Sequence, residues 1–249
     1  YQKAAIGLNV EFCPNLNVMK TLSDKAKQKE VLSELNIETA KFTVCSDEKN
    51  LNEWVGDALK RFGEDVVFKW GSRGYDGKGL LISPKKTEQA AILSFARETI
   101  SHGGRVYAEE KIPFKRELAI LGCVSKNGEF ANYPLVVSEQ KNGICSVVTG
   151  PASKLGVDPQ HEVKAIEYVR KLAEGLKIVG TFAVELFETV DGRILVNEIA
   201  PRVHNSGHYS QDCCKTSQFE NHLHAALGMP LGEVSTTPFF GMYNLLGPT

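Results

Sequence analysis

The chain has 249 residues and a mass of 27.4 kDa, enough for one large α/β domain or two smaller ones whose core needs no covalent staple. With 42% hydrophobic and 24% charged residues, it has the composition of a folded protein, which excludes intrinsic disorder. A formal net charge of −1, a sequence pI of about 6.7 and apolar runs of only a few residues indicate neither a nucleic-acid partner nor a membrane span.

The first half of the chain predicts a small α/β unit that follows a connecting helix. Apolar residues recur at helical spacing in three segments, and short apolar runs between them have the length of strands. In chain order, the predicted elements are a helix that begins at Ser23-Asp24, an extended piece at 37–44, a helix at 51–62, strands at 65–70 and 80–83, and a helix at about 87–101. We therefore expect residues 1–40 to be the end of a preceding domain with its connecting helix, and residues 41–107 to be a small subdomain.

The second half predicts a larger unit in which strands predominate. Asp158-Pro159 and the capping box Ser217-x-x-Glu220 begin its two helices, and Asn127-Gly128 and Asp191-Gly192 are typical of hairpin turns. The predicted strands are 107–110, 117–124, 130–136, 145–148, 181–189 and 193–199. Runs of strands with interspersed helices indicate an α+β fold on a mostly antiparallel sheet, with residues 108–249 as the large subdomain.

A glycine-rich loop, Gly74-Tyr75-Asp76-Gly77-Lys78-Gly79, separates two of the predicted strands. Its glycines would let backbone amides approach a phosphate, and Lys78 adds a positive charge. The loop is neither a Walker A motif nor a dinucleotide fingerprint, because no helix follows it directly. A plain β-hairpin explains the pattern equally well. Lys69, at the end of an otherwise apolar strand, either extends to solvent or reaches toward a ligand anion.

Two glutamates are expected to face each other across the second predicted hairpin. If Asp191-Gly192 forms a two-residue turn, Phe187 pairs with Val196 and Glu185 pairs with Glu198, which places both carboxylates on one face with Cβ atoms about 5 Å apart. A divalent cation would offset this repulsion, and oxygen-only ligands indicate Mg²⁺ or Mn²⁺. The alternative keeps both glutamates on a solvated face with arginines nearby, and an odd-length loop would shift the register and separate them.

Polar residues crowd into the segment 197–208, directly after the last predicted strand. Arg202 beside a carboxylate-bound cation would suit the charge of a transferring phosphoryl group, although it could equally be the salt-bridge partner of one glutamate. His204 and His208, followed by Cys213-Cys214, do not have the spacing of a zinc module.

The expected link between the subdomains is rich in charge. Glu109-Glu110 and Glu117 flank the segment 111–116, in which the backbone and Ile112 could hold an adenine edge and ribose hydroxyls. An acidic pair beside lysines is also typical of a solvated turn.

The six cysteines are scattered and show no Cys-x-x-Cys spacing, which is typical of reduced thiols in a cytoplasmic protein. The sequence begins at Tyr1 without an initiator methionine or a signal-type apolar stretch, so we expect it to be a piece of a longer protein.

Taken in order, these motifs resemble the ATP-grasp superfamily, and within it the 5-(carboxyamino)imidazole ribonucleotide synthases of purine biosynthesis. The resemblance covers nearly the whole chain from Asp24 onward. The segments that carry it are Gly74 to Gly79, Ala108-Glu109, Phe114-x-x-Glu117-Leu118, Tyr133-Pro134-Leu135, Phe182 to Phe187, Asn197 to His208 and Thr216 to Glu220. It implies an ATP-dependent carbon–nitrogen ligase in which ATP and bicarbonate form carboxyphosphate, which carboxylates 5-aminoimidazole ribonucleotide and releases ADP and phosphate. It also suggests a homodimer.

The resemblance implies roles for individual residues as well. Glu185 and Glu198 would hold Mg²⁺, with Mn²⁺ as a substitute, in agreement with the hairpin argument. Arg202 would be the catalytic residue. The residues that would face bicarbonate, carboxyphosphate and the imidazole nucleotide are Tyr75, Asp76, Arg202, His204 and Asn205. The residues implied in ATP binding are Lys25, Lys69, Gly74, Tyr75, Asp76, Gly77, Lys78, Gly79, Glu109, Glu110, Lys111, Ile112, Glu117, Gln140 and Asn197.

The sequence departs from the family pattern at several positions. Arg73 replaces a glycine, Trp70-Gly71 replaces residues that are commonly polar or basic, and Gln140 stands where a histidine is usual near the nucleotide. The sequence also shows little of the family's N-terminal α/β domain and C-terminal region. Two other hypotheses therefore stay open: another ATP-grasp ligase, such as a formate-using glycinamide ribonucleotide enzyme, and a nucleotide-binding fragment without this activity.

Overall fold

The computed structural model describes residues 10–63, 65–72, 79–83, 89–141 and 143–245, which form two compact units. The larger unit contains residues 10–22, 114–141 and 145–245, and the smaller unit contains residues 23–113 with 143–144. The division differs from the expected one, because the connecting helix belongs to the smaller unit and the boundary falls after residue 113. The strand β4 (Val106–Glu110) pairs with strands of the smaller unit on both of its edges, so the chain cannot be divided at 107.

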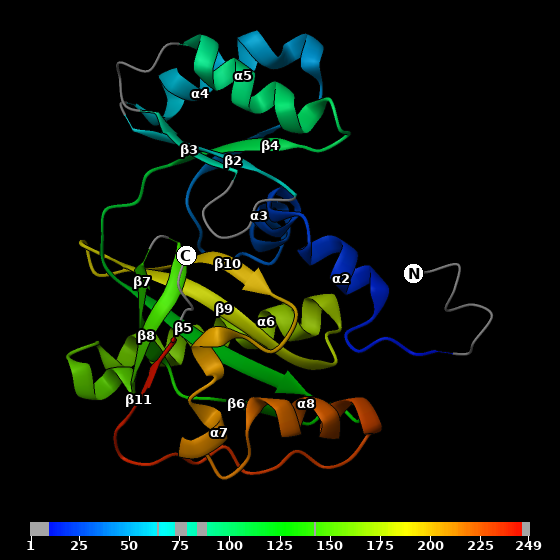
Figure 1. The fold of residues 1–249 in the computed structure, drawn as a ribbon, viewed down its shortest axis with the longest axis vertical. Coiled ribbons are helices and arrows are strands. Elements are labelled where there is room, and N and C mark those ends of the chain that lie inside the picture. The colour runs from blue at the N-terminus through cyan, green and yellow to red at the C-terminus, as the bar shows by residue number, and fades with distance from the viewer. Residues whose placement is uncertain (1–9, 64, 73–78, 84–88, 142, 246–249) are drawn as a thin grey trace. The chain divides into compact units, whose positions relative to one another are not determined.

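The smaller unit is an antiparallel sheet with helices on both faces (Figure 1). Its strand order is β1-β4-β2-β3, and the three strands besides β4 are β1 (Phe42–Cys45), β2 (Val66–Trp70) and β3 (Leu80–Ser83). Its helices are α3 (Lys25–Glu34), α4 (Leu51–Phe62) and α5 (Gln89–Ile100). Helices α4 and α5 cover one face and α3 lies against the other. The predicted helices and strands of this half are confirmed, although β1 is shorter than the extended piece expected there.

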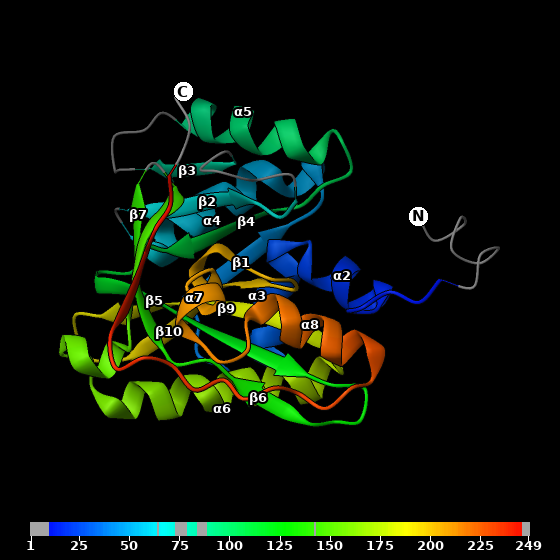
Figure 2. The ribbon, with the colours of Figure 1, turned by 60° about the horizontal axis from the view of Figure 1, so that its bottom comes forward.

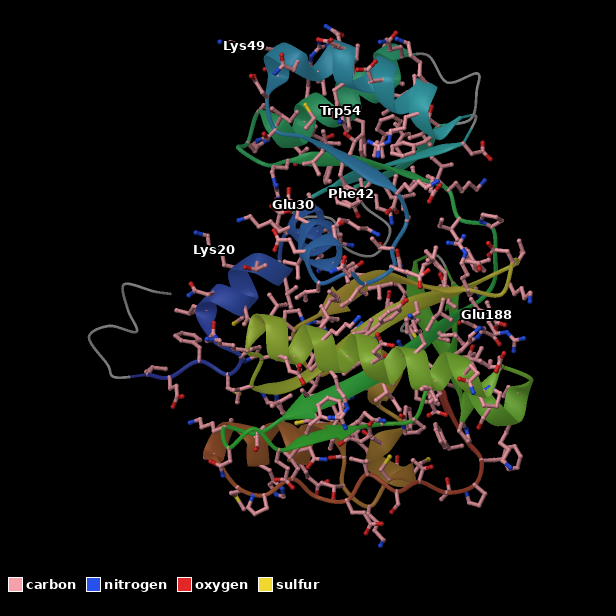
Figure 3. The ribbon with its side chains drawn as sticks, turned by 180° about the vertical axis from the view of Figure 1, so that it is seen from behind. Lys20, Glu30, Phe42, Lys49, Trp54 and Glu188 are labelled. Carbon is pink, nitrogen blue, oxygen red and sulfur yellow. The ribbon has the colours of Figure 1, made fainter. Side chains whose placement is uncertain are left out.

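The core of the smaller unit lies between the sheet and α4 and α5. Val66 and Phe68 of β2 and Val55 of α4 are fully buried there. Trp54 packs edge-on against Phe68, with ring centroids 5.8 Å apart, and its indole N–H donates to Thr43 Oγ1 at 3.2 Å (Figure 3). The helical spacing of apolar residues thus marks the face that α4 buries.

The larger unit contains a seven-stranded sheet with the order β10-β9-β5-β7-β8-β11, in which β6 pairs with β5 outside this path. The strands are β5 (Phe114–Val124), β6 (Phe130–Asn132), β7 (Val136–Lys141), β8 (Ile144–Gly150), β9 (Gly180–Thr189), β10 (Ile194–Ala200) and β11 (Phe240–Tyr243). The helices are α2 (Leu16–Leu22), α6 (Pro159–Leu176), α7 (Ser210–Cys213) and α8 (Gln218–Leu227). Pairing within both sheets is antiparallel wherever the register is described, which confirms the predicted α+β fold.

Successive residues of β9 face opposite sides of this sheet, which lies between α6 and α8 (Figure 2). Glu188 faces α6, where its Oε1 lies 3.9 Å from His161 Nδ1 (Figure 3). Thr181 faces α8 and donates its hydroxyl to the Gln218 carbonyl at 3.0 Å. Glu185, four residues beyond Thr181, lies on the same face and keeps 28% of its side chain exposed. The alternation therefore places Glu185 on the α8 side of the sheet.

Helix boundaries in the larger unit follow the predicted capping signals. Asp158 accepts from the Gln160 N–H and Pro159 is the first residue of α6. Ser217 and Glu220 form the complete capping box of α8. Along the described part of the chain, no helix combines the length and the apolar composition that crossing a bilayer requires.

The sequence did not predict the strands β7 and β11 or the short helices α2 and α7 of the larger unit. The strand expected at 130–136 is divided, because β6 ends before Pro134 and β7 begins after it. Proline has no backbone N–H to donate to a sheet, so it interrupts the strand. The polar half of β7, the short β11 and the seven-residue α2 carry too weak a periodic pattern to be recognised.

Candidate functional site

The β9–β10 hairpin carries the glutamate pair, and its turn differs from the prediction. The turn comprises residues 190–192, because the Thr189 N–H donates to the Arg193 carbonyl at 2.9 Å. Its third residue is a glycine with φ of +81°, as three-residue hairpin loops require. Phe187 consequently pairs with Leu195, one residue away from the expected partner. The prediction of a two-residue turn is wrong.

A β-bulge at Asn197 then restores the expected pairing of the glutamates. The register shifts between Val196 and Glu198, so that Glu198 lies opposite Glu185. In a bulge, two residues of one strand oppose one residue of the other, and Asn197 is the additional residue here. Without the bulge, Glu198 would face the opposite side of the sheet. The pairing is confirmed, although its cause is a feature that the sequence did not indicate.

The neighbouring strand β5 extends this face of the sheet. Ala119 pairs with Glu185, and Glu117 pairs with Phe187, so all four side chains share one face. Phe187 stacks on Phe114 with ring centroids 4.6 Å apart. Burial raises the pKa of Glu117. Sequence reasoning did not single out Phe187, although its position two residues after Glu185 on a strand places it on the same face of the sheet.

The segment after β10 brings a histidine close to the glutamate pair. His204 Nδ1 accepts from the Ser206 N–H, which assigns the proton of the neutral ring to Nε2. Nε2 lies 3.6 Å from Glu185 Oε1. Burial, assisted by the charge of Arg202, lowers the pKa of His204 to about 4 against the opposing effect of Glu198. The imidazole is therefore neutral at pH 7 and acts as a hydrogen-bonding group rather than as a cation.

The other two predicted substrate residues of the larger unit lie in the same segment. Arg202 is exposed, and its guanidinium donates to the Val203 carbonyl at 2.9 Å. Asn205 is half-buried and begins a short 3₁₀ turn. One loop thus carries a charged, a neutral aromatic and an amide side chain, of which His204 lies next to Glu185.

The glutamate pair suits a hard divalent cation that is held together with an anionic ligand. The part of the chain that the structure describes contains no cluster of three or more His, Cys, Asp or Glu side chains able to hold a metal ion. Mg²⁺ commonly uses one or two carboxylates, with water and substrate phosphates as its other ligands. Two carboxylates at directly opposed positions fit this requirement, whereas a structural zinc ion would need four protein ligands.

In the smaller unit, Glu109 lies between two lysines in a buried triplet of charges. Glu109 Oε2 lies 2.9 Å from Lys29 Nζ, and Glu109 Oε1 lies 2.5 Å from Lys69 Nζ. Burial alone would raise the pKa of Glu109, but the two ammonium groups lower it to about 2. Lys69 is held by this carboxylate rather than extended into solvent. Sequence reasoning missed Lys29, because a lysine on a helix normally indicates a solvated face.

The remaining predicted ATP residues of the smaller unit lie at chain connections. Lys25 is the first residue of α3, and Ile112 lies between β4 and β5. Glu110 Oε1 accepts from the Lys41 N–H at 2.9 Å, and Lys111 forms an ion pair of 3.1 Å with an aspartate. Their contact with a nucleotide stays a prediction.

The glycine-rich loop is described only at its end. Gly79 has φ of +75° and its carbonyl accepts from the Trp70 N–H at 2.9 Å. In the larger unit, Gln140 is exposed on β7. The residues Arg73, Gly74, Tyr75, Asp76, Gly77 and Lys78 lie outside the described residues.

The fold and this site define a class of α+β proteins built from two units with antiparallel sheets, one of which presents a carboxylate pair. A family model described as the ATP-grasp domain matches residues 30–219, which is most of the chain. The chain belongs to the ATP-grasp family.

Similarity to individual proteins extends over almost the entire chain. N5-carboxyaminoimidazole ribonucleotide synthase of Vibrio vulnificus (strain CMCP6) is 36% identical over 244 residues, which are 95% of this chain and 61% of the relative. A carboxyaminoimidazole ribonucleotide synthase from Aspergillus clavatus, solved with ATP, matches with a TM-score of 0.85 and 29% identity over 97% of this chain and 61% of that chain. N5-carboxyaminoimidazole synthase from the same organism, solved with ADP and 5-aminoimidazole ribonucleotide, matches with a TM-score of 0.82 and 28% identity over 98% and 62%. The chain therefore spans about three fifths of the length of these proteins.

Proposed function

We propose that this chain is the ATP-grasp part of an enzyme that carboxylates 5-aminoimidazole ribonucleotide in purine biosynthesis. The observation that carries the proposal is the bulge that sets Glu198 opposite Glu185, beside the loop with Arg202 and His204. In the reaction, a bicarbonate oxygen attacks the γ-phosphorus of ATP and ADP leaves. The amine nitrogen then attacks the carboxyl carbon of carboxyphosphate, phosphate leaves, and the nitrogen loses a proton. The products are 5-(carboxyamino)imidazole ribonucleotide, ADP and phosphate.

In this proposal, Glu185 and Glu198 hold Mg²⁺, or Mn²⁺ in its place, together with ATP. When bound, the ion supplies charge neutralisation for the phosphate oxygens. Asn197, the bulged residue beside Glu198, is proposed to contact the triphosphate, and Glu117 on β5 is proposed to contact the ribose. The stacked pair of Phe114 and Phe187 adds an apolar surface on the same face of the sheet.

The loop after β10 supplies the groups proposed to face bicarbonate, carboxyphosphate and the imidazole nucleotide. Arg202 provides the positive charge that favours a transferring phosphoryl group. His204 is neutral at pH 7, because burial lowers its pKa to about 4, so it contributes a hydrogen bond without a second positive charge. Asn205 adds an amide that both donates and accepts. The loop thereby combines one cation with neutral polar groups.

The predicted ligands of the smaller unit complete the proposal. Lys25 and Lys69 are proposed to contact phosphates, and Glu109 to Ile112 to line the adenine pocket. Because Glu109 already binds Lys29 and Lys69, we propose that its main role is to hold Lys69 in position. A homodimer and a cytoplasmic location are carried over from the family resemblance as parts of this proposal.

The proposal is tested by measuring ADP release with bicarbonate, in the presence and absence of 5-aminoimidazole ribonucleotide. We expect ADP release that depends on bicarbonate and increases with the imidazole nucleotide. Because the chain spans about three fifths of its relatives, the assay is run on this chain and on the chain extended to their full length. ADP release by the extended protein that responds to neither compound would contradict the proposal.

Two alternatives give different results in the same assay. A nucleotide-binding part without activity would bind Mg²⁺·ATP but turn over only in the extended protein. Another ATP-grasp ligase would release ADP with a different acceptor, such as glycinamide ribonucleotide and formate.

A further inference from the structure

The first residue of α8, Gln218, is fully buried and lies against the loop that carries the proposed substrate residues. Its side-chain Oε1 accepts from the His204 N–H at 2.8 Å, and its Nε2 donates to the His204 carbonyl at 2.8 Å. One amide side chain therefore satisfies both backbone groups of one residue, as a neighbouring strand does in a sheet.

Two further hydrogen bonds fix Gln218 itself. Its backbone N–H donates to Ser210 Oγ at 3.0 Å, and the Ser210 hydroxyl donates to the Gly207 carbonyl at 2.6 Å. Its carbonyl accepts from Thr181 Oγ1 at 3.0 Å. Thr181 lies on β9, four residues before Glu185 and on the same face of the sheet. Gln218 thus joins the His204 loop to the strand that carries the glutamate.

The Gln218 amide packs closely against Gly207. A Cβ added to Gly207 would lie 2.9 Å from the Gln218 side-chain amide and 2.3 Å from a methyl group of Leu121. A buried backbone N–H or C=O without a partner is costly, so loss of the amide would favour movement of the loop. Glycine at 207 is therefore part of the same contact.

We propose that Gln218 is a positioning residue that holds the Arg202–Asn205 segment at a fixed place relative to Glu185, through its two hydrogen bonds to the His204 backbone. The proposal rests on the proposed function, because the segment it positions is the one assigned to the imidazole nucleotide. It assigns to Gln218 no contact with substrate. Its expected effect is on binding of the nucleotide that the loop faces, and not on binding of ATP.

The test compares Gln218→Met with Asn221→Leu in the full-length enzyme. Asn221 is an equally buried amide on α8, but it donates to Tyr133 Oη and accepts from the Gly232 N–H, away from the loop. We expect Gln218→Met to raise the KM for 5-aminoimidazole ribonucleotide at least 10-fold while changing the KM for ATP less than 2-fold. Asn221→Leu should change neither KM, although it also removes buried hydrogen bonds.

Hydrogen exchange at the His204 backbone amide tests the contact independently of activity. We expect faster exchange in Gln218→Met and unchanged exchange in Asn221→Leu. Ser210→Ala provides a second variant that keeps the Gln218 side chain, and it should raise the same KM by a smaller factor. If Gln218→Met does not fold, the decision rests on Ser210→Ala.

The outcomes separate this proposal from the proposed function. An unchanged KM for the imidazole nucleotide in Gln218→Met, or an equal increase in Asn221→Leu, would overturn the positioning role and leave the function intact. If only Ser210→Ala folds, an unchanged KM for the imidazole nucleotide together with unchanged hydrogen exchange at the His204 amide would overturn the positioning role. Absence of a response to the imidazole nucleotide in the wild-type enzyme would overturn the proposed function, and the positioning role with it.

Discussion

Glu109 is an ionised carboxylate whose side chain is only 5% exposed to solvent. Taking charges out of water is costly, and the two lysines offset that cost only while all three side chains are present. Removing one member leaves an uncompensated buried charge, for which the loss is about 3–5 kcal/mol. At the scale of single residues, the smaller unit therefore depends on charge pairing as well as on its apolar core.

Lowering the pH should decrease the free energy of unfolding as Glu109 becomes protonated. Its pKa is about 2 in the folded chain, against a reference value of 4.5. A lowered carboxyl pKa contributes stability that is present above the reference value and is lost as the pH falls from about 4.5 toward 2. We expect the free energy of unfolding in urea to fall between pH 5 and pH 3 more steeply in the wild type than in Glu109→Gln. Glu48→Gln, at an exposed ion pair with Arg97, serves as the control and should keep the wild-type slope.

Arg202 is expected to act in the chemistry rather than in folding, because its side chain is exposed. We predict that Arg202→Ala lowers kcat on the order of 100-fold, the usual effect of losing one donor to transition-state charge, and leaves the melting temperature unchanged. Arg193→Ala is the matched control, since Arg193 is also exposed and pairs with Asp191 at the hairpin turn. Equal kcat values for wild type and Arg202→Ala would remove Arg202 from the mechanism.

At the scale of elements, local chemistry predicted most of the fold. Capping at Asp158 and Ser217 depends on residues within one helical turn, so the helix starts were readable. The bulge at Asn197 could not be predicted, because it depends on how β10 fits against β9 rather than on the residues around it in the sequence. The Gln218 contact with His204 was equally hidden, since 14 residues separate two groups that meet only in the folded chain.

Close packing of α6 on the sheet makes Gly122 sensitive to a single methyl group. A Cβ there would lie 2.4 Å from a methyl group of Val169 and 3.1 Å from the ring of Phe182. We predict that Gly122→Ala lowers the free energy of unfolding by about 1–3 kcal/mol, the usual cost of overpacking. Gly56→Ala is the control, because Gly56 lies within α4 with nothing inside 4 Å, and it should stabilise by about 0.5–1 kcal/mol. Equal effects of the two substitutions would contradict this account of the packing.

At the scale of the whole molecule, the residues that the family resemblance implicates in ATP binding are distributed over both units. The larger unit carries the opposed carboxylates, and the smaller unit carries the lysines. The sequence predicted both sets through motifs that lie far apart along the chain. The sequence could not predict that Glu109 forms an ion pair with Lys29, because the two residues are 80 positions apart and meet only after the smaller unit has folded.

Binding of Mg²⁺·ATP should raise the melting temperature of the protein. A ligand at about 100 times its Kd stabilises a folded protein by about 2.7 kcal/mol, so the shift is readily measured. We expect the shift with Mg²⁺ and ATP together, a much smaller one with ATP and a chelator, and none in Glu198→Gln, which should fold normally and lose turnover. Glu174→Gln, at an exposed position on α6, should behave as the wild type. A full shift in Glu198→Gln would argue against the metal assignment.

The larger unit is interrupted in sequence by the smaller one, and this order has a consequence for synthesis on the ribosome. Residues 23–113 emerge as a nearly complete unit, whereas α2 belongs to the larger unit, most of which is translated later. At about 5–20 residues per second, β11, which pairs with β8 at the edge of the sheet, follows on the order of 10 s afterwards. The nascent chain therefore carries one nearly complete unit and only the beginning of the other, and premature termination before residue 240 would release a sheet that still lacks its last strand.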